Sequence, residues 1–178
     1  NGSDISIQAR SLAVTNGARL DASTFGQGSA GSIAIQADEA VVFDNSQISS
    51  SVQPGATGAG GNIKIDAGSL GVTNGAQLNA ITFGQGSAGS LTIAARDAIS
   101  FDGQNRKGQP SGAFSNVQAG ALGNGGDINI TAGSLSLTDS AQIGNGIDGA
   151  ISQLPGGRGN SGSVNINVRD AFTITGVN

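Results

Sequence analysis

The chain contains no histidine, cysteine, methionine, tryptophan or tyrosine among its 178 residues. Without histidine there is no Ser-His-Asp triad, no imidazole base and no imidazole ligand for a metal. Without cysteine there is no disulfide framework, no thiolate metal site and no cysteine nucleophile. These absences remove the commonest catalytic groups, and we expect the chain to be no enzyme, with no catalytic residue, cofactor or metal.

Charge and hydropathy argue against two classes of partner. The chain has 8 Lys and Arg residues against 12 Asp and Glu, and the basic residues are scattered, so no patch predicts nucleic-acid binding. No apolar run approaches the roughly 20 residues that a membrane-spanning helix needs. The chain starts at Asn1 with neither a signal peptide nor an initiating methionine, and we interpret it as a segment of a larger precursor.

Glycine is abundant, with 31 residues, and much of it belongs to an internal repeat. Residues 14–32 (VTNGARLDASTFGQGSAGS) and 72–90 (VTNGAQLNAITFGQGSAGS) differ at three of 19 positions and are offset by 58 residues. A shorter period divides this repeat, with unit starts separated by 28, 30, 28, 37 and 36 residues. The starts are SDISI at Ser3, GSIAI at Gly31, GNIKI at Gly61, GSLTI at Gly89, GDINI at Gly126 and GSVNI at Gly162.

Each unit contains three short stretches in which apolar and polar residues alternate. In the first unit these stretches are residues 5–9, 12–15 and 18–22. A period of two is the signal of a β-strand, and no window keeps a helical period over three turns. The sequence therefore predicts three strands in each unit.

Three strands per unit, with no helix between them, favour an all-β fold of the right-handed parallel β-helix (solenoid) type. It would have about six turns of three short strands each, over a single segment of residues 1–178. Parallel crossovers are nearly always right-handed, which gives the expected hand. The two longest units contain insertions near 103–113 and 146–160, which we expect to leave the stack as loops.

Stacking of equivalent strands predicts ladders of equivalent residues. The first strand would align Ile5, Ile33, Ile63, Leu91, Ile128 and Val164; the second, Val14, Phe43, Val72, Phe101, Leu137 and Ile174; the third, Leu20, Ile48, Leu78, Val117 and Ile143. Two outward ladders would follow the second strand: Thr15, Asp44, Thr73, Asp102, Thr138 and Thr175, then Asn16, Asn45, Asn74, Gly103, Asp139 and Gly176. Asn, Asp and Gly tolerate left-handed backbone, so the second of these ladders predicts a sharp corner.

The repeats AGSLxVTNGAxLxAxTFGQGSAG and G[SND]IxIxA resemble those of the filamentous haemagglutinin-like large exoproteins of two-partner secretion, of the cyanobacterial type. The resemblance implies a right-handed parallel β-helix and a parent protein exported by a dedicated outer-membrane transporter. It also implies a secreted, extracellular, cell-surface-associated location and a role in adhesion or in building a filament. No catalytic residue of that family maps onto this chain.

Four features are candidate sites. The GQGSAG segments, 26–31 and 84–89, lack the lysine and the following helix of a phosphate-binding loop, so we expect turns. Asp44 and Asp102 lie on one predicted ladder with Thr73 between them. Their separation would suit an inverting glycosidase, but with no aromatic platform nearby we expect them to cap the corner or to be solvated.

The remaining candidates are charged. Asp38-Glu39, Asp97 and Asp170 recur at one corner and could form a weak calcium site, but Arg96 and Arg169 accompany two of them, so we expect local ion pairs. In the first insertion, Arg106-Lys107 with Phe114 could contact an anionic glycan; the alternative is a plain solvated loop.

These observations favour a structural or adhesive segment of a secreted surface or filament protein. Its expected partners are itself, through end-to-end stacking, or neighbouring repeats of the parent chain, then the outer-membrane transporter and surface glycans. The alternative is a polysaccharide-binding or polysaccharide-processing β-helix protein, which would need a convergent carboxylate cleft.

Overall fold

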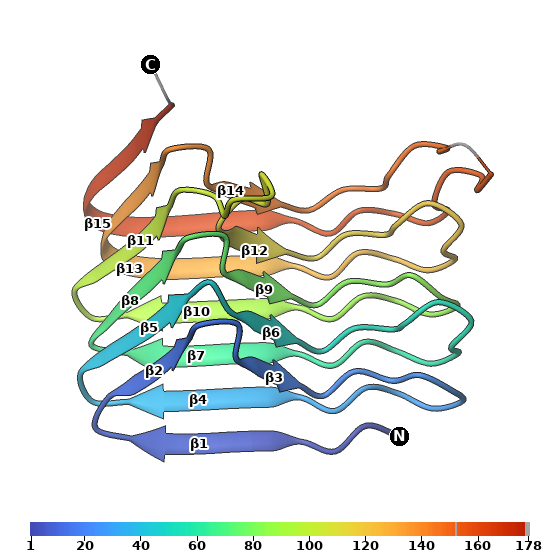
Figure 1. Ribbon diagram of the computed structural model, residues 1–178, viewed down its shortest axis with the longest axis horizontal. Helices are drawn as coiled ribbons and strands as arrows, with labels where there is room; N and C mark the ends of the chain where they lie inside the picture. The colour runs from blue at the N-terminus through green and yellow to red at the C-terminus, as the bar shows by residue number, and fades with distance from the viewer. Residues whose placement is uncertain (152, 177–178) are drawn as a thin grey trace.

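The computed structural model describes residues 1–151 and 153–176, and all of its regular structure there is β-strand (Figure 1). The predicted segment 1–178 and its second insertion, 146–160, include three residues outside this description: Val177, Asn178 and Ser152. The strands form two sheets, of ten and five members, and every pairing between named strands is parallel.

The larger sheet holds the first and second stretches of every unit. Its strands are β1 (Ile5–Ala9), β2 (Leu12–Thr15), β4 (Ile33–Ala37), β5 (Ala40–Asp44), β7 (Ile63–Ala67), β8 (Ser69–Thr73), β10 (Leu91–Ala95), β11 (Ala98–Asp102), β13 (Ile128–Thr138) and β15 (Val164–Thr175). The smaller sheet holds the third stretches: β3 (Arg19–Asp21), β6 (Gln47–Ser49), β9 (Gln77–Asn79), β12 (Gly112–Phe114) and β14 (Gln142–Gly144). We call the units that start at β1, β4, β7, β10, β13 and β15 layers one to six.

The strand order contradicts the predicted fold class, a right-handed parallel β-helix of about six turns with three short strands in each. β13 and β15 run unbroken through the corner between the first and second stretches, so those stretches share one sheet. That sheet has the order β1-β4-β7-β10-β13-β11-β8-β5-β2. The first stretches pair along one side, which we call the first limb, and the second stretches pair along the other side, the second limb. Because β13 belongs to both limbs, the sheet is nearly closed and barrel-like. The physical reason is that backbone pairing between β13 and β15 continues past the corner. The register only shifts between Ala132 and Ser134, where β15 has one residue more than β13.

The predicted ladders of the first and second strands are confirmed residue by residue. Ile5 pairs with Ile33, Ile33 with Ile63 and Leu91 with Ile128. Along the second stretch, the pairs from Val14 and Phe43 through to Leu137 and Ile174 are also those expected. The alternation of the sequence places these side chains on the inner face of the sheet, because successive residues of a strand point to opposite faces.

The third ladder is wrong at one residue. Ala113, and not Val117, lies between Leu78 and Ile143. Val117 belongs to a later ladder, between Thr82 and Ile147. The insertion in layer four hid the true alignment, because the small residue Ala113 gives a weaker strand signal than the valine after it.

One continuous core fills the space between the two limbs and the smaller sheet. Its largest fully buried side chains include Phe43 and Phe101, which alternate along their ladder with Val14, Val72 and Leu137. Large and small side chains therefore interleave from layer to layer, which fills volume without voids.

A thin wing extends from the core, on the right in Figure 1, where the chain leaves the smaller sheet and returns to the larger one. It carries two further ladders of single paired positions. The first runs Thr24, Val52, Thr82, Val117 and Ile147, and the second Gln27, Thr57, Gln85, Leu122 and Arg158. The outgoing and returning arms lie at backbone distance, as shown by the hydrogen bonds from Gly31 N to Ala22 O (2.8 Å) and from Gly89 N to Ala80 O (3.0 Å).

Glycine is required at the wing tip because the layers touch there through backbone alone. Gly86 has a φ of 138°, and a Cβ built on it would lie 1.9 Å from the carbonyl oxygen of Gly58. No side chain fits at that distance. The GQGSAG repeat is thus a turn with close backbone stacking, as the sequence predicted.

Phe43→Ala tests the aliphatic and aromatic ladder. Phe43 is 0% exposed, so its removal leaves a cavity between layers, and we expect a loss of about 3–5 kcal/mol in the free energy of unfolding. Urea unfolding followed by circular dichroism measures it. Phe25→Ala is the matched control: Phe25 is 73% exposed, and we expect a change within about 0.5 kcal/mol. Equal losses in the two variants would contradict the assigned core.

Gly86→Ala tests the stacking of the wing. The new methyl group meets the Gly58 backbone, so we expect destabilisation of about 2 kcal/mol or more. The control in the same layer is Gly71→Ala, because a Cβ at Gly71 meets nothing within 4 Å. Thermal unfolding of both variants checks the prediction, and an undiminished melting temperature for Gly86→Ala would show that the wing layers are not in contact.

Candidate functional site

The corner after the second stretch is built from left-handed asparagines. Asn16, Asn45 and Asn74 follow β2, β5 and β8, with φ values of 57°, 43° and 53°. The layers pair here through backbone, with Asn16 N donating to Asp44 O (3.2 Å) and Gly17 N to Asn45 O (2.7 Å). The predicted corner is confirmed, and its consequence is a column of exposed amide side chains.

The carboxylates beside this column cap it. Asp44 Oδ1 accepts hydrogen bonds from Thr73 Oγ1 (3.0 Å) and from the side-chain amide of Asn74. Asp102 likewise accepts from the Thr138 hydroxyl of the next layer. Thr73 lies between the two aspartates on the same ladder. We expected Asp44 and Asp102 to cap the corner or to be solvated, and both carboxylates accept hydrogen bonds from side chains of the following layer at this corner.

The chain between β11 and β12 forms a tight loop whose hub is Asn105. The Oδ1 atom of Asn105 accepts from Lys107 N (2.9 Å) and Gln109 N (3.1 Å), and its Nδ2 donates to Gln109 Oε1 (2.8 Å). An asparagine side chain that binds its own backbone in this way fixes a turn. Gly108, with a φ of 75°, supplies the left-handed residue that the turn needs.

The loop lies directly on layer three. A Cβ built on Gly75 would be 2.7 Å from the Asn105 Cβ atom, so only glycine leaves room for the loop. Gly75 N donates to Ser111 Oγ (2.8 Å), and Gln77 Nε2 donates to Pro110 O (3.2 Å). A loop that starts in layer four is thereby anchored over the asparagine column of the earlier layers.

Between the loop and the column lies a groove of about 700 Å³. It is lined by Asn16, Asp44, Asn45, Asn74, Gln104, Asn105, Arg106, Lys107 and Gln109. A smaller hollow of about 170 Å³ shares Asn45, Asn105 and Gln109 with it and continues toward Arg19 and Gln77 of the smaller sheet. We call the larger hollow the amide groove.

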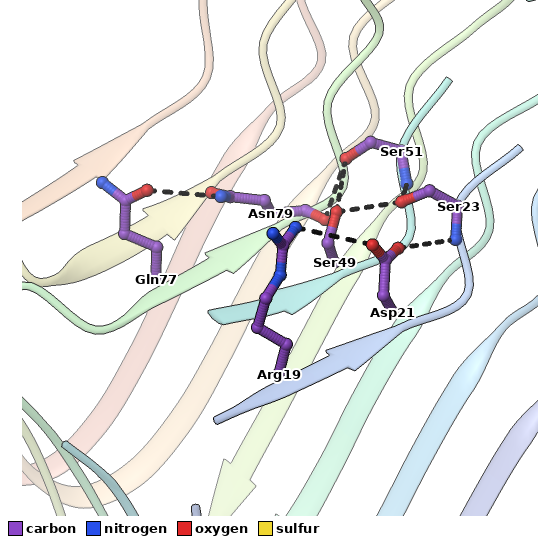
Figure 2. Close-up of polar contacts among 7 residues, drawn as sticks. All are labelled: Arg19, Asp21, Ser23, Ser49, Ser51, Gln77 and Asn79. Carbon is purple, nitrogen blue, oxygen red and sulfur yellow. Dashed lines mark hydrogen bonds and ion pairs between the residues drawn. The ribbon is translucent and has the colours of Figure 1, made fainter. Parts of the chain in front are cut away.

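The smaller sheet carries a group of polar side chains that contact one another within and between layers (Figure 2), although Asn79 Oδ1 is buried without a hydrogen-bond partner. Ser49 Oγ lies 3.0 Å from Ser23 Oγ and 3.2 Å from Ser51 Oγ. Asp21 Oδ1 accepts from Ser23 N (3.0 Å), and Asp21 Oδ2 lies 3.5 Å from Arg19 NH2. The Ser23–Ser49 contact joins layers one and two, as does the hydrogen bond from Ser51 N to Ser23 Oγ (3.1 Å). The contact between Ser49 and Ser51 and those of Asp21 each lie within one layer.

The other charged candidates form ion pairs or remain separate. Arg96 lies 3.3 Å from Asp97, Arg169 lies 3.2 Å from Asp170, and all four side chains are exposed. The predicted local pairing is therefore present. In the described part of the chain, no group of three or more His, Cys, Asp or Glu residues could hold a metal ion.

Phe114 does not join Arg106 and Lys107. It is buried in β12, where its ring lies over Gly112 and Gly144. The two cations instead line the amide groove with the asparagine column, a contact that sequence reasoning missed. The only signal for it was the turn pattern of Asn105 and Gly108; nothing in the sequence shows toward which layer the loop folds.

No protein-family model matches the chain, and comparison with curated proteins and with solved structures finds no similar protein. The resemblance to filamentous haemagglutinin-like exoproteins therefore stays a prediction that rests on the repeat residues. Over residues 1–151 and 153–176, no helix is long and apolar enough to cross a membrane.

Substitutions at Asn45 distinguish the need for a left-handed backbone from the need for an amide side chain. We expect Asn45→Ala to cost about 1 kcal/mol, because a Cβ-bearing residue without a polar side chain is strained at a φ of 43°. Asn45→Gly should cost clearly less, since glycine adopts this conformation freely. Urea midpoints of the two variants measure the difference. If glycine is as destabilising as alanine, the amide itself, and not the left-handed backbone, holds the corner.

Proposed function

We propose that the chain is a structural and adhesive segment of a secreted, surface-associated protein, with no enzymatic activity of its own. The observation that carries this proposal is the unbroken register of the stack. Successive first-stretch residues Ile5, Ile33, Ile63, Leu91, Ile128 and Val164 stay aligned although their spacing varies from 28 to 37 residues.

In a stack of this kind, different residues hold the fold together and contact a partner. The inner ladders fix the scaffold, and extra residues emerge at corners and at the wing tip without disturbing the register. The loop over Gly75 is one such displayed element. Weak contacts repeated along such a surface add up to strong attachment when many engage at once.

The sixth layer favours association with a further layer. Val164, Phe172 and Ile174 are 44%, 46% and 71% exposed. Their ladder partners in layer five, Ile128, Leu135 and Leu137, are buried, and layer six covers them. Among the described strands, β15 pairs with β13 alone, so its other edge offers free backbone groups as well.

The first layer has the complementary surface. Ile5, Ile7 and Leu12 are only partly buried, on the same ladders as the exposed residues of layer six. Placing layer one of a second copy on layer six of the first would extend the ladders of the first and second stretches by one step, because the described part of layer six consists of β15 alone. Neighbouring repeats of a parent chain would satisfy the same surface in the same way.

Phe172→Lys tests end-to-end stacking. A charge in the apolar end layer must be desolvated on association, so we expect this variant to remain shorter than the wild-type chain at every concentration. Negative-stain electron microscopy and light scattering over a concentration series measure particle length and mass.

The matched control is Phe83→Lys, which places the same charge on the wing of layer three, away from both ends. This variant should assemble like the wild type. A wild-type chain that stays a monodisperse monomer throughout the series would contradict self-stacking. Turnover of an acidic polymer by the purified chain would contradict the structural function altogether.

A further inference from the structure

The amide groove is lined by polar side chains only. Six of its nine lining residues are amides: Asn16, Asn45, Asn74, Gln104, Asn105 and Gln109. Asn74, Asn105 and Gln109 use part of their side-chain amides within the chain, and each remaining donor or acceptor suits a ligand that presents hydroxyl groups. An apolar ligand would find no complementary surface there.

The charged groups of the groove favour an anion. Asp44 contributes one negative charge, although its Oδ1 accepts hydrogen bonds from Thr73 and Asn74, whereas Arg106 and Lys107 contribute two positive charges. The four ion pairs among the described residues use Arg10, Arg19, Arg96 and Arg169, so Arg106 and Lys107 present their exposed charges to the groove without a carboxylate partner there. The groove is thus locally cationic on a chain whose net charge is -4.

The groove also lacks an aromatic side chain, which would give a neutral sugar ring an apolar platform. Binding must come from hydrogen bonds and charge. Among hydroxyl-rich ligands, those that carry carboxylates gain charge-assisted bonds from Arg106 and Lys107 that a neutral glycan cannot make. We propose that the amide groove binds a segment of an acidic polysaccharide, with uronate carboxylates at Arg106 and Lys107 and sugar hydroxyls at the asparagine column.

Two features of the geometry indicate a polymer segment and not a single sugar. The groove continues into the smaller hollow through Asn45, Asn105 and Gln109, so the polar path is longer than one hollow. The walls are also preformed. Asn105 locks the loop internally, and Gly75 and Gln77 hold it on layer three, so little ordering is left for the ligand to impose.

This proposal rests on the adhesive function and deepens it by naming the surface that the segment would attach to. The experiment uses the full chain and a fluorescently labelled short oligogalacturonate, with a neutral galactan oligomer of equal length as reference. Fluorescence anisotropy at low and high salt measures binding. We expect binding of the oligogalacturonate alone, weakening as salt rises because the contacts lie at the surface.

The decisive variant is Arg106→Gln with Lys107→Gln. Both side chains are exposed on the loop and hold no other element in place, so folding should be unchanged. Loss of two surface charge contacts should weaken binding about five- to tenfold. The matched control, Arg10→Gln with Lys64→Gln, removes the same charge from exposed positions outside the groove and should bind as the wild type does.

A second variant tests the amides. Asn45→Gly keeps the left-handed corner, at a φ of 43°, but removes one amide from the groove, and it should bind more weakly with little loss of stability. The proposal is overturned if no oligogalacturonate binds, if the galactan binds equally well, or if the control variant weakens binding as much as the loop variant. None of these results would change the stacking measured by electron microscopy, so the two proposals fail independently.

Discussion

Parallel pairing between layers, in a fixed register, is the constraint on which the rest of this structure depends. A short strand cannot satisfy its own backbone groups, and each layer completes those of its neighbours. The register then decides which side chains meet. Ile5, Ile33 and Ile63 must all be apolar because they occupy one column of the core. Gly58 and Gly86 must both lack side chains because a Cβ on either would meet the backbone of the layer before, at Gly28 and Gly58 respectively.

The same constraint explains which parts of the structure the sequence could predict. A register that repeats in space must repeat along the chain, so the ladders of Val14 and of Asn16 are legible from periodicity alone. Val117 was misplaced because an insertion broke the period just before it, and the small Ala113 gave no competing signal. The grouping of strands into sheets was not legible. It depends on whether pairing continues through the corner: Gly133 lies inside β13, whereas Gly68, at the same corner of layer three, separates β7 from β8.

The amide groove is less predictable from the sequence than the ladders or the grouping of strands into sheets. Its column follows from the repeat, but its other wall comes from an insertion that has no counterpart in the other layers. That wall has its place because Gly75 leaves room for Asn105 and because Gln77 donates to Pro110. Gly75 has a structural reason of its own, with a φ of 78° at the corner, so its second role as a seat for the loop leaves no separate mark on the sequence.

The asparagine column shows how a stacking requirement can supply binding chemistry. The corner needs residues that accept left-handed backbone, and asparagine meets that need at Asn16, Asn45 and Asn74 while glycine meets it at Gly103. Only asparagine adds a side-chain amide. The choice of asparagine or glycine at each position therefore decides whether the column can form hydrogen bonds to a ligand there. Because layers repeat about 4.8 Å apart, such amides stand at regular intervals along the stack. A polymer with regularly spaced hydroxyl and carboxylate groups can therefore meet several of them at once, and each contact can be weak without the attachment being weak.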